Sequence, residues 1–188
     1  MDQEFVEEKI GAKVFELSIR KIVVIGPEST GKSTLSEALA KELKTVWVPE
    51  YAREYLESLN RPYNENDLLE IAKGQLATED KLHQQAHDFL ICDTDLNVIK
   101  VWSEHKYQRC AKWILEQIAI RRYDLYLLTY IDVLWQDDPL REHNSEDMRR
   151  YFYEQYKDIV MNSGVRWIDI RGNRNTRLLT ALNAIKQL

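Results

Sequence analysis

Residues 21–33 read Lys-Ile-Val-Val-Ile-Gly-Pro-Glu-Ser-Thr-Gly-Lys-Ser, and this stretch decides the fold. Its first five residues form a largely apolar run that is typical of a buried parallel strand. The other eight match the phosphate-binding pattern GxxxxGK(S/T) at every defined position. Residues 32–44 then carry leucines at helical spacing, so a strand precedes the motif and a helix follows it. The pattern and its context together predict a phosphate-binding loop.

The residue types in this loop suit the binding of a nucleoside triphosphate. Glycines let the backbone approach phosphate oxygens closely, and successive N–H groups form an anion nest at a helix N-terminus. Lys32 can neutralise the β- and γ-phosphates, and the Ser33 hydroxyl can bind Mg²⁺. We therefore expect the phosphates to be bound by Gly26, Glu28, Ser29, Thr30, Gly31, Lys32, Ser33 and Thr34.

Short β-branched runs alternate with helical stretches along the rest of the chain. Strands are predicted at 21–25, 45–48, 89–92, 125–130 and 166–170. Helices are predicted at 32–44, 65–87 with Asn64 as its N-cap, 96–122, 145–162 with Ser145 as its cap, and from 175 onward. This order predicts a three-layer α/β/α sandwich with a mainly parallel five-stranded sheet. The loops that follow the strands then lie along one edge of the sheet, where ligands bind.

Composition narrows the class of protein. The chain has 188 residues, 44% hydrophobic and 30% charged, which is typical of one globular domain. Its net charge of -5 argues against a dedicated nucleic-acid binder. Two cysteines, an acidic N-terminus and the lack of an 18-residue apolar run argue against a disulfide framework, secretion or a membrane span. We expect a cytoplasmic protein with no nucleic-acid or membrane partner, built from one domain at 20–188 and an extension at 1–19 of unassigned role.

Acidic residues at the ends of strands are the candidate metal ligands. Asp93 directly follows the strand predicted at 89–92, and Asp95 lies two residues further on. A carboxylate beside a phosphate-binding loop can hold Mg²⁺ together with Ser33, and we expect Asp93 in this role. Asp95 has an alternative role, as the N-cap of the following helix.

Two charged residues follow the second predicted strand. Glu50 lies at its carboxyl end, where a carboxylate can bind a ribose or accept the proton of an attacking hydroxyl. It can equally be a charge that complements a helix N-terminus. Arg53 can contact substrate or form an i,i+4 surface pair with Glu57.

The segment 131–150 is predicted to form a lid. Asp137, Asp138 and Pro139 make residues 131–144 a poor helix, and Arg141 can stabilise the charge of a transferring phosphoryl group. Of Arg149 and Arg150, we expect one to be a plain surface residue. Trp135 can stack on a planar base of the substrate, or can seal the core beneath the lid.

A GTPase is not expected, because the chain has no NKxD motif and no glycine closes a DxxG motif at Asp93. The chain instead resembles the NadR-type ribosylnicotinamide kinase domain, in the stretches 26–35, 50–55, 93–95, 135–138 and 140–141 within residues 20–186. That resemblance implies transfer of the ATP γ-phosphate, with Mg²⁺, to the ribose 5′-hydroxyl of a nucleoside, nicotinamide riboside. Taken together, the expected catalytic residues are Lys32, Asp93, Glu50 and Arg141, and the expected acceptor-binding residues are Glu50, Tyr51, Arg53, Asp95 and Trp135.

The remaining expectations concern the position of the adenine, the activities that are not expected, and the oligomeric state. The adenine is expected near residues 171–174, after the fifth strand. The helix-turn-helix and nucleotidyltransferase domains of full-length NadR proteins have no counterpart in the chain, so DNA regulation and adenylyl transfer are not expected. An ATP-hydrolysing regulatory or binding module of the same class, with no small-molecule acceptor, remains the alternative. The oligomeric state is left open.

Overall fold

The structure is a computed structural model that describes residues 19–188. The predicted extension, apart from its last residue, lies outside the described residues. Within the described part the strands are β1 (Arg20–Ile25), β2 (Trp47–Val48), β3 (Phe89–Asp93), β4 (Leu125–Thr129) and β5 (Trp167–Ile170). The helices there are α1 (Lys32–Glu42), α2 (Tyr51–Ser58), α3 (Glu65–His83), α4 (Leu96–Tyr107), α5 (Lys112–Ile120), α6 (Glu146–Asn162) and α7 (Arg174–Ile185).

The five strands form one sheet in the order β2-β3-β1-β4-β5, and every neighbouring pair is parallel. The ladder pairs Val24 of β1 with Asp93 of β3, and Ile25 of β1 with Leu128 of β4. The predicted α/β class with a five-stranded parallel sheet is therefore confirmed. This register also brings the carboxyl ends of β1, β3 and β4 to one edge, directly beside the motif at 26–33.

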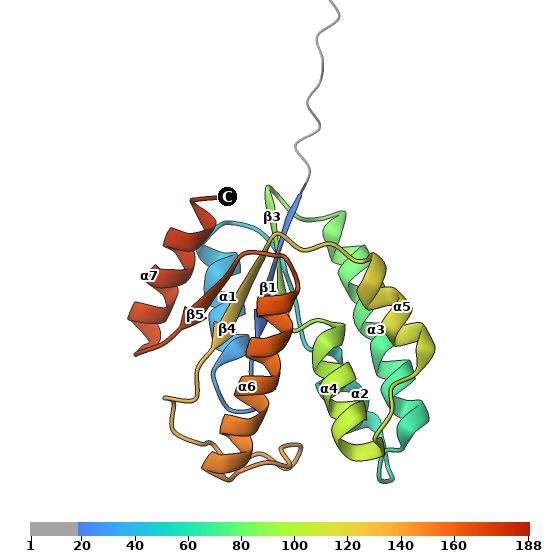
Figure 1. Cartoon of the computed structure of the whole chain (residues 1–188). Coiled ribbons are helices and arrows are strands. Elements are labelled where there is room, and N and C mark those ends of the chain that lie inside the picture. The colour runs from blue at the N-terminus through green and yellow to red at the C-terminus, as the bar shows by residue number, and fades with distance from the viewer. Residues whose placement is uncertain (1–18) are drawn as a thin grey trace, which may run out of the picture.

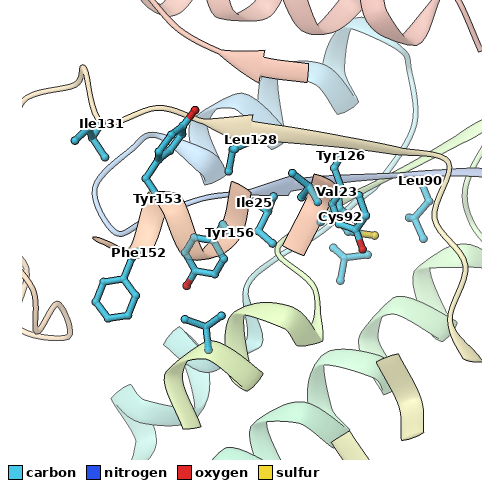
Figure 2. Close-up of a cluster of buried hydrophobic side chains, with 13 residues drawn as sticks. Val23, Ile25, Leu90, Cys92, Tyr126, Leu128, Ile131, Phe152, Tyr153 and Tyr156 are labelled. Carbon is cyan, nitrogen blue, oxygen red and sulfur yellow. The ribbon is translucent and has the colours of Figure 1, made fainter. Parts of the chain in front are cut away.

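Helices cover both faces of the sheet (Figure 1). On one face, α1 and α7 pack their apolar residues, such as Leu39 and Ala181, against Val24. On the other face, α4 and α6 bury Val101 and Tyr153, and Figure 2 shows this layer with side chains of β1, β3, β4 and α6. A third cluster joins α2, α3, α4 and α5 without any strand residue, and its buried members are Ala52, Leu68, Ile71, Ala72, Leu76, Leu96, Ile99 and Ile114.

Helix boundaries confirm some predictions and correct others. Asn64 caps α3 through a capping box with Asp67, and Ser145 caps α6 by accepting from the Met148 N–H. The single helix predicted at 96–122 is wrong, because α4 ends at Tyr107 and its C-cap, Gln108, has a left-handed φ of 56°. The chain then turns, with the Ser103 hydroxyl donating to the Arg109 carbonyl, and α5 folds back. The helix at Tyr51–Ser58 was not predicted, and α3 ends before the expected residue 87.

None of the helices within residues 19–188 is both long and apolar enough to cross a membrane.

Candidate active site

The loop between β1 and α1 is tied to the end of β4. Gly26 lies so close to Thr129 that a Cβ on Gly26 would come 2.3 Å from the Thr129 hydroxyl oxygen. The Thr30 side chain is fully buried, donates to the Pro27 carbonyl at 2.8 Å, and pairs with the Thr129 hydroxyl at 2.7 Å. Gly31 has a φ of 78°, a conformation that favours glycine, and begins α1 as its N-cap. The loop is thus held by buried contacts of its own.

This loop presents hydrogen-bond donors. In the described part of the chain, the backbone N–H groups from Ser29 to Thr34 meet no acceptor. They lie at the N-terminus of α1, where the helix dipole favours an anion. The Lys32 ammonium group donates to the Pro27 carbonyl at 2.9 Å, which holds its charge beside the same loop. The arrangement is that of a phosphate-binding site, as the motif predicts.

Asp93 lies at the end of β3, next to the β1 residue that leads into this loop. Its side chain is completely buried, and among residues 19–188 neither carboxylate oxygen has a hydrogen-bond partner. Burial and the nearby Glu50 carboxylate raise the pKa of Asp93, while the Lys32 ammonium and the Ser33 hydroxyl oppose this rise. An unpartnered carboxylate near a hydroxyl is a donor set that suits Mg²⁺, which prefers oxygen ligands. No cluster of three or more His, Cys, Asp or Glu side chains that could hold a metal ion occurs in residues 19–188.

Asp95 has a different environment. Its side chain caps α4 by accepting from the Asn97 backbone N–H at 3.0 Å, and it also accepts from the Tyr126 hydroxyl at 2.8 Å. Burial raises its pKa to about 6, although these hydrogen bonds oppose the shift. Neither Asp93 nor Asp95 lines the cavity described next, but both oxygens of Asp95 already accept hydrogen bonds, so its position matches the capping alternative.

One cavity of about 760 Å³ runs along this edge of the sheet. At one end it is lined by Gly172, Asn173 and Arg174, in the loop where the adenine was expected. Its middle is lined by residues 26–35. Its other end is lined by carboxylates, arginines and aromatic rings, which are Glu50, Arg53, Trp102, Arg141, Glu142, His143, Phe152 and Tyr156. We call the two ends the donor end and the acceptor end.

Glu50 is held in the acceptor end by a residue that the sequence did not reveal. The buried Gln75 amide accepts from the Tyr51 N–H at 2.8 Å and donates to the Pro49 carbonyl at 3.3 Å, so it binds the backbone on both sides of Glu50. A Cβ on Gly74 would come 2.0 Å from the Tyr51 ring, so the glycine is needed for this packing. Tyr51 itself packs on α3 and does not line the cavity, unlike the predicted substrate contact.

The segment 131–144 contains neither helix nor strand, as predicted, and it is attached to the phosphate-binding loop. The Glu28 carboxylate accepts from the N–H groups of Glu142 and His143, at 3.4 and 3.1 Å. The Ser29 hydroxyl accepts from the Gln136 N–H at 2.9 Å. The Glu28 and Ser29 side chains therefore bind this segment, while the backbone of their loop faces the cavity.

Arginines connect the same segment to the cavity. Arg53 pairs with Asp138 at 2.7 Å and more loosely with Glu57 at 3.5 Å, so the predicted surface pair exists beside a longer-range one. Arg141 lines the acceptor end. Arg149 is buried, whereas Arg150 is exposed and pairs with Glu146, which confirms that one of these two is a surface residue.

Trp135 lies outside the main cavity. It lines a shallower hollow together with Asp137, Pro139 and other residues of the same segment. Its indole N–H donates to Asp137 at 2.8 Å, and the Arg141 guanidinium lies 5.7 Å from the ring centroid. Stacking of Trp135 on a substrate stays a prediction that this arrangement does not favour. The indole ring that does line the acceptor end is that of Trp102, whose N–H donates to the Tyr63 hydroxyl at 2.7 Å.

Comparison with known proteins agrees with this geometry. Residues 21–177 match the family described as AAA domain. The trifunctional NAD biosynthesis/regulator protein NadR of Salmonella typhimurium is 24% identical, over 96% of this chain and 45% of NadR. The chain thus spans about half the length of the curated relatives it matches.

Solved structures give the same result. A crystal structure of NadR in complex with NR has a TM-score of 0.71 and 25% identity, and covers 90% of this chain and 49% of that one. Thymidylate kinase from Ehrlichia chaffeensis has a TM-score of 0.59 at 18% identity, over 89% and 99% of the two chains, which shows a shared fold. The resemblance to NadR that the sequence suggested is confirmed, and the chain belongs to the AAA domain family, as a phosphate-loop domain homologous to part of NadR.

Proposed function

We propose that the protein is an ATP-dependent phosphotransferase, a ribosylnicotinamide kinase that transfers the γ-phosphoryl group of ATP to the ribose 5′-hydroxyl of nicotinamide riboside. The observation that carries this proposal is that the same cavity joins the phosphate-binding loop to an acidic and aromatic acceptor end. A module that only hydrolysed ATP would need no such second compartment. The NadR structure with NR supports the choice of acceptor.

The donor end suits ATP. Its base would lie between the loop at 172–174 and the N-terminal part of α7, and its phosphates would accept hydrogen bonds from the N–H groups of residues 29–34. Asp93 and Ser33 would hold Mg²⁺, which neutralises phosphate charge when bound. Lys32 adds a further positive charge at the same loop.

The acceptor end suits a cationic nucleoside. Nicotinamide riboside carries a positive charge on its planar ring, and such a cation is attracted to aromatic faces and to carboxylates. Trp102, Phe152 and Tyr156 supply aromatic surface, and Glu142 supplies a carboxylate. Glu50 lies on the side toward the phosphate-binding loop, since its charge acts on Asp93.

Transfer of the γ-phosphoryl group needs a general base for the ribose hydroxyl and stabilisation of the negative charge on the phosphoryl oxygens. The Glu50 carboxylate accepts the proton of the ribose 5′-hydroxyl as that oxygen bonds to the γ-phosphorus. The bond between the γ-phosphorus and the β–γ bridging oxygen breaks, and ADP leaves with that oxygen. Lys32 and Arg141 stabilise the negative charge on the phosphoryl oxygens during transfer. The segment 131–150, which carries Arg141, acts as the lid over the reacting groups.

The test is incubation of the protein with ATP, Mg²⁺ and nicotinamide riboside, followed by mass spectrometry of the nucleoside. We expect a product heavier by one phosphoryl group, formed together with ADP. Thymidine monophosphate and deoxyadenosine, run in parallel, test the acceptors suggested by other proteins of this fold. ADP formation without phosphorylation of any nucleoside would favour the alternative, an ATP-hydrolysing regulatory module.

A further inference from the structure

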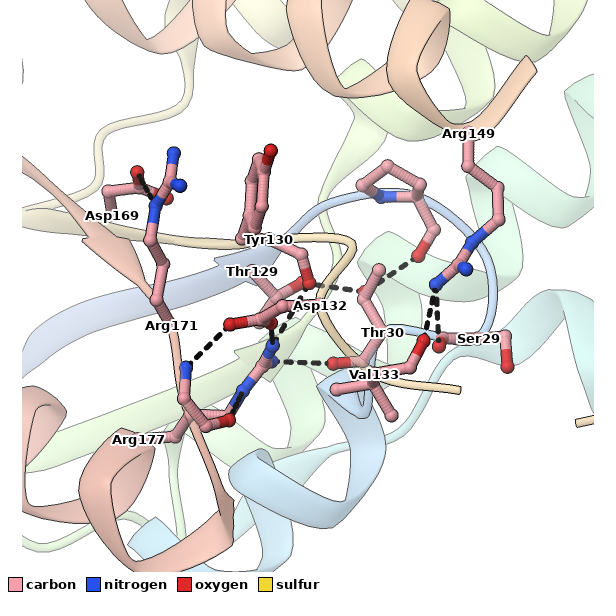
Figure 3. A network of polar contacts seen from close by, with 12 residues as sticks. Ser29, Thr30, Thr129, Tyr130, Asp132, Val133, Arg149, Asp169, Arg171 and Arg177 are labelled. Atoms are coloured by element: carbon pink, nitrogen blue, oxygen red, sulfur yellow. Dashed lines mark hydrogen bonds and ion pairs between the residues drawn. The ribbon is translucent and has the colours of Figure 1, made fainter. Parts of the chain in front are cut away.

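Two buried arginines bind consecutive carbonyl groups of the phosphate-binding loop, as Figure 3 shows. Arg149 of α6 donates to the Ser29 carbonyl at 3.2 Å, and Arg177 of α7 donates to the Thr30 carbonyl at 2.8 Å. Their exposed fractions are 6% and 5%. Among the described residues Arg149 binds only neutral carbonyls, so its buried charge loses hydration without a paired carboxylate and needs an explanation, whereas Arg177 also pairs with Asp132.

The geometry of the peptide bond explains why arginines would bind these carbonyl groups. In a trans peptide the C=O and the N–H of one unit point in opposite directions. A donor that fixes the Ser29 carbonyl on the outside of the loop therefore directs the Thr30 N–H toward the inside. In the same way, fixing the Thr30 carbonyl directs the Gly31 N–H inward. These two N–H groups belong to the set that meets no acceptor within residues 19–188.

We propose that Arg149 and Arg177 are positioning residues, which bind ATP phosphates indirectly by holding two peptide units of the loop with their N–H groups directed at the phosphates. Arg149 does not line the cavity. Arg177 does, but its guanidinium is occupied by the carbonyls of Thr30, Tyr130 and Gly172 and by Asp132. This inference rests on the proposed function only in taking a nucleoside triphosphate as the ligand.

The two arginines differ in what else they bind. Arg149 also donates to the Val133 carbonyl at 3.1 Å, in the segment that follows β4. Arg177 also donates to the Gly172 carbonyl at 2.8 Å, and Asp132 in turn accepts from the Gly172 N–H at 2.7 Å. Arg177 therefore connects the phosphate-binding loop to the loop at the base end of the cavity. Loss of Arg149 should disturb phosphate binding alone, and loss of Arg177 should disturb both phosphate and base binding.

Calorimetric titration with ATP and with inorganic tripolyphosphate, both with Mg²⁺, separates these effects. Arg149→Lys keeps the charge but loses the planar fork of donors. It should weaken both ligands by the same factor, about tenfold, which is what loss of a charged hydrogen bond predicts. Arg177→Lys should weaken ATP several times more than tripolyphosphate. Arg150→Lys is the matched control, because Arg150 is exposed and pairs, among the described residues, with Glu146 alone. It should change neither Kd beyond twofold.

A folded Arg149→Lys or Arg177→Lys variant that binds tripolyphosphate as well as the unmodified protein would overturn the proposal. So would an Arg149→Lys variant that loses affinity for ATP but not for tripolyphosphate. If neither variant folds, amide hydrogen exchange of the unmodified protein decides: tripolyphosphate should slow exchange at Thr30 and Gly31, and unchanged rates there would refute the proposal. No nucleoside acceptor enters these measurements, so an absence of kinase activity would leave their outcome unaffected.

Discussion

The donor end and the acceptor end of the cavity are built in different ways. The donor end consists of backbone groups held by buried side chains, such as Thr30 and Arg177, which are 0% and 5% exposed. The acceptor end consists of side chains: the buried rings of Phe152 and Tyr156 on α6, and charged groups of which Arg53 and Glu142 are 47% and 40% exposed. Phosphate binding therefore depends on the fold itself, whereas the choice of acceptor depends on side chains, and the exposed ones among them can change without disturbing the fold.

The largest effect should come from Lys32→Ala. Lys32 acts on ligand charge and takes no part in core packing, so transfer should fall by about 10²–10³-fold with the melting temperature nearly unchanged. Steady-state kinetics and a thermal melt without ligand measure the two quantities. Lys41→Ala, an exposed residue of the same helix, is the control and should leave both unchanged. Retention of most activity by Lys32→Ala would remove the phosphate-loop assignment.

Asp93→Asn should separate catalysis from stability. The substitution removes a metal ligand, so turnover should fall and the Mg²⁺ titration should shift to higher concentrations. The apo protein should become more stable, by about 2–4 °C in melting temperature, because a buried carboxylate without partners is lost.

The pH dependence of the stability gained by Asp93→Asn follows from the sign of the pKa shift of Asp93. Asp93 has a folded-state pKa of about 7, raised by burial from an ordinary value near 4. The folded state then binds its proton more tightly, so ionisation destabilises the protein increasingly as pH rises through this interval. The advantage of Asp93→Asn should be absent below about pH 4 and complete above about pH 7, in melts with EDTA. An advantage that is constant with pH would contradict the assigned shift.

Gln75→Leu tests whether the acceptor end depends on the position of Glu50. Leucine fills a similar volume but cannot bind the peptides on either side of Glu50. We expect kcat/KM for the acceptor to fall by about tenfold or more, since small displacements of reacting groups are costly. The Kd for tripolyphosphate should not change, because Gln75 does not line the cavity and its hydrogen bonds go to Pro49 and Tyr51. An equal loss for both ligands would indicate a general loss of structure.

The smallest predicted effect compares two tryptophans. Trp102→Ala should raise the acceptor KM by about 2- to 30-fold, the range expected for loss of a cation–π contact, and should leave ATP binding intact. Trp135→Ala should change the acceptor KM less than twofold, because Trp135 lies outside the cavity. A larger increase in acceptor KM for Trp135→Ala than for Trp102→Ala would mean that the segment 131–144 moves Trp135 onto the acceptor, as the sequence-based stacking prediction requires.

The donor end could be predicted from the sequence because its determinants are local. Gly26, Gly31, Lys32 and Ser33 lie within one motif, and Asp93 is recognised from the end of a strand. The acceptor end is set by contacts between distant residues: Gln75 binds backbone groups 24 and 26 positions away, so no local pattern marks it.

Other features of the site and the fold could not be predicted from the sequence, for related reasons. Arg149 and Arg177 lie on amphipathic helices, where an arginine is usually a surface residue, and only tertiary packing buries them. Trp102 in the middle of α4 is typical of core packing from sequence alone. The break between α4 and α5 falls at residues 108–111, which include neither glycine nor proline. For Arg149 and Arg177, the deciding partners come from another part of the chain.

The apolar cluster shared by α2, α3, α4 and α5 contains no strand residue, and this separation has a dynamic consequence. A group of helices with its own interior can open cooperatively while the sheet stays intact, as a unit of lower stability than the whole domain. Ala52 of α2, adjacent to Arg53, belongs to that unit, and Val48 of β2 belongs to the sheet. We expect amides of α2 to exchange with solvent sooner than those of β1, and the acceptor to enter and leave through such openings.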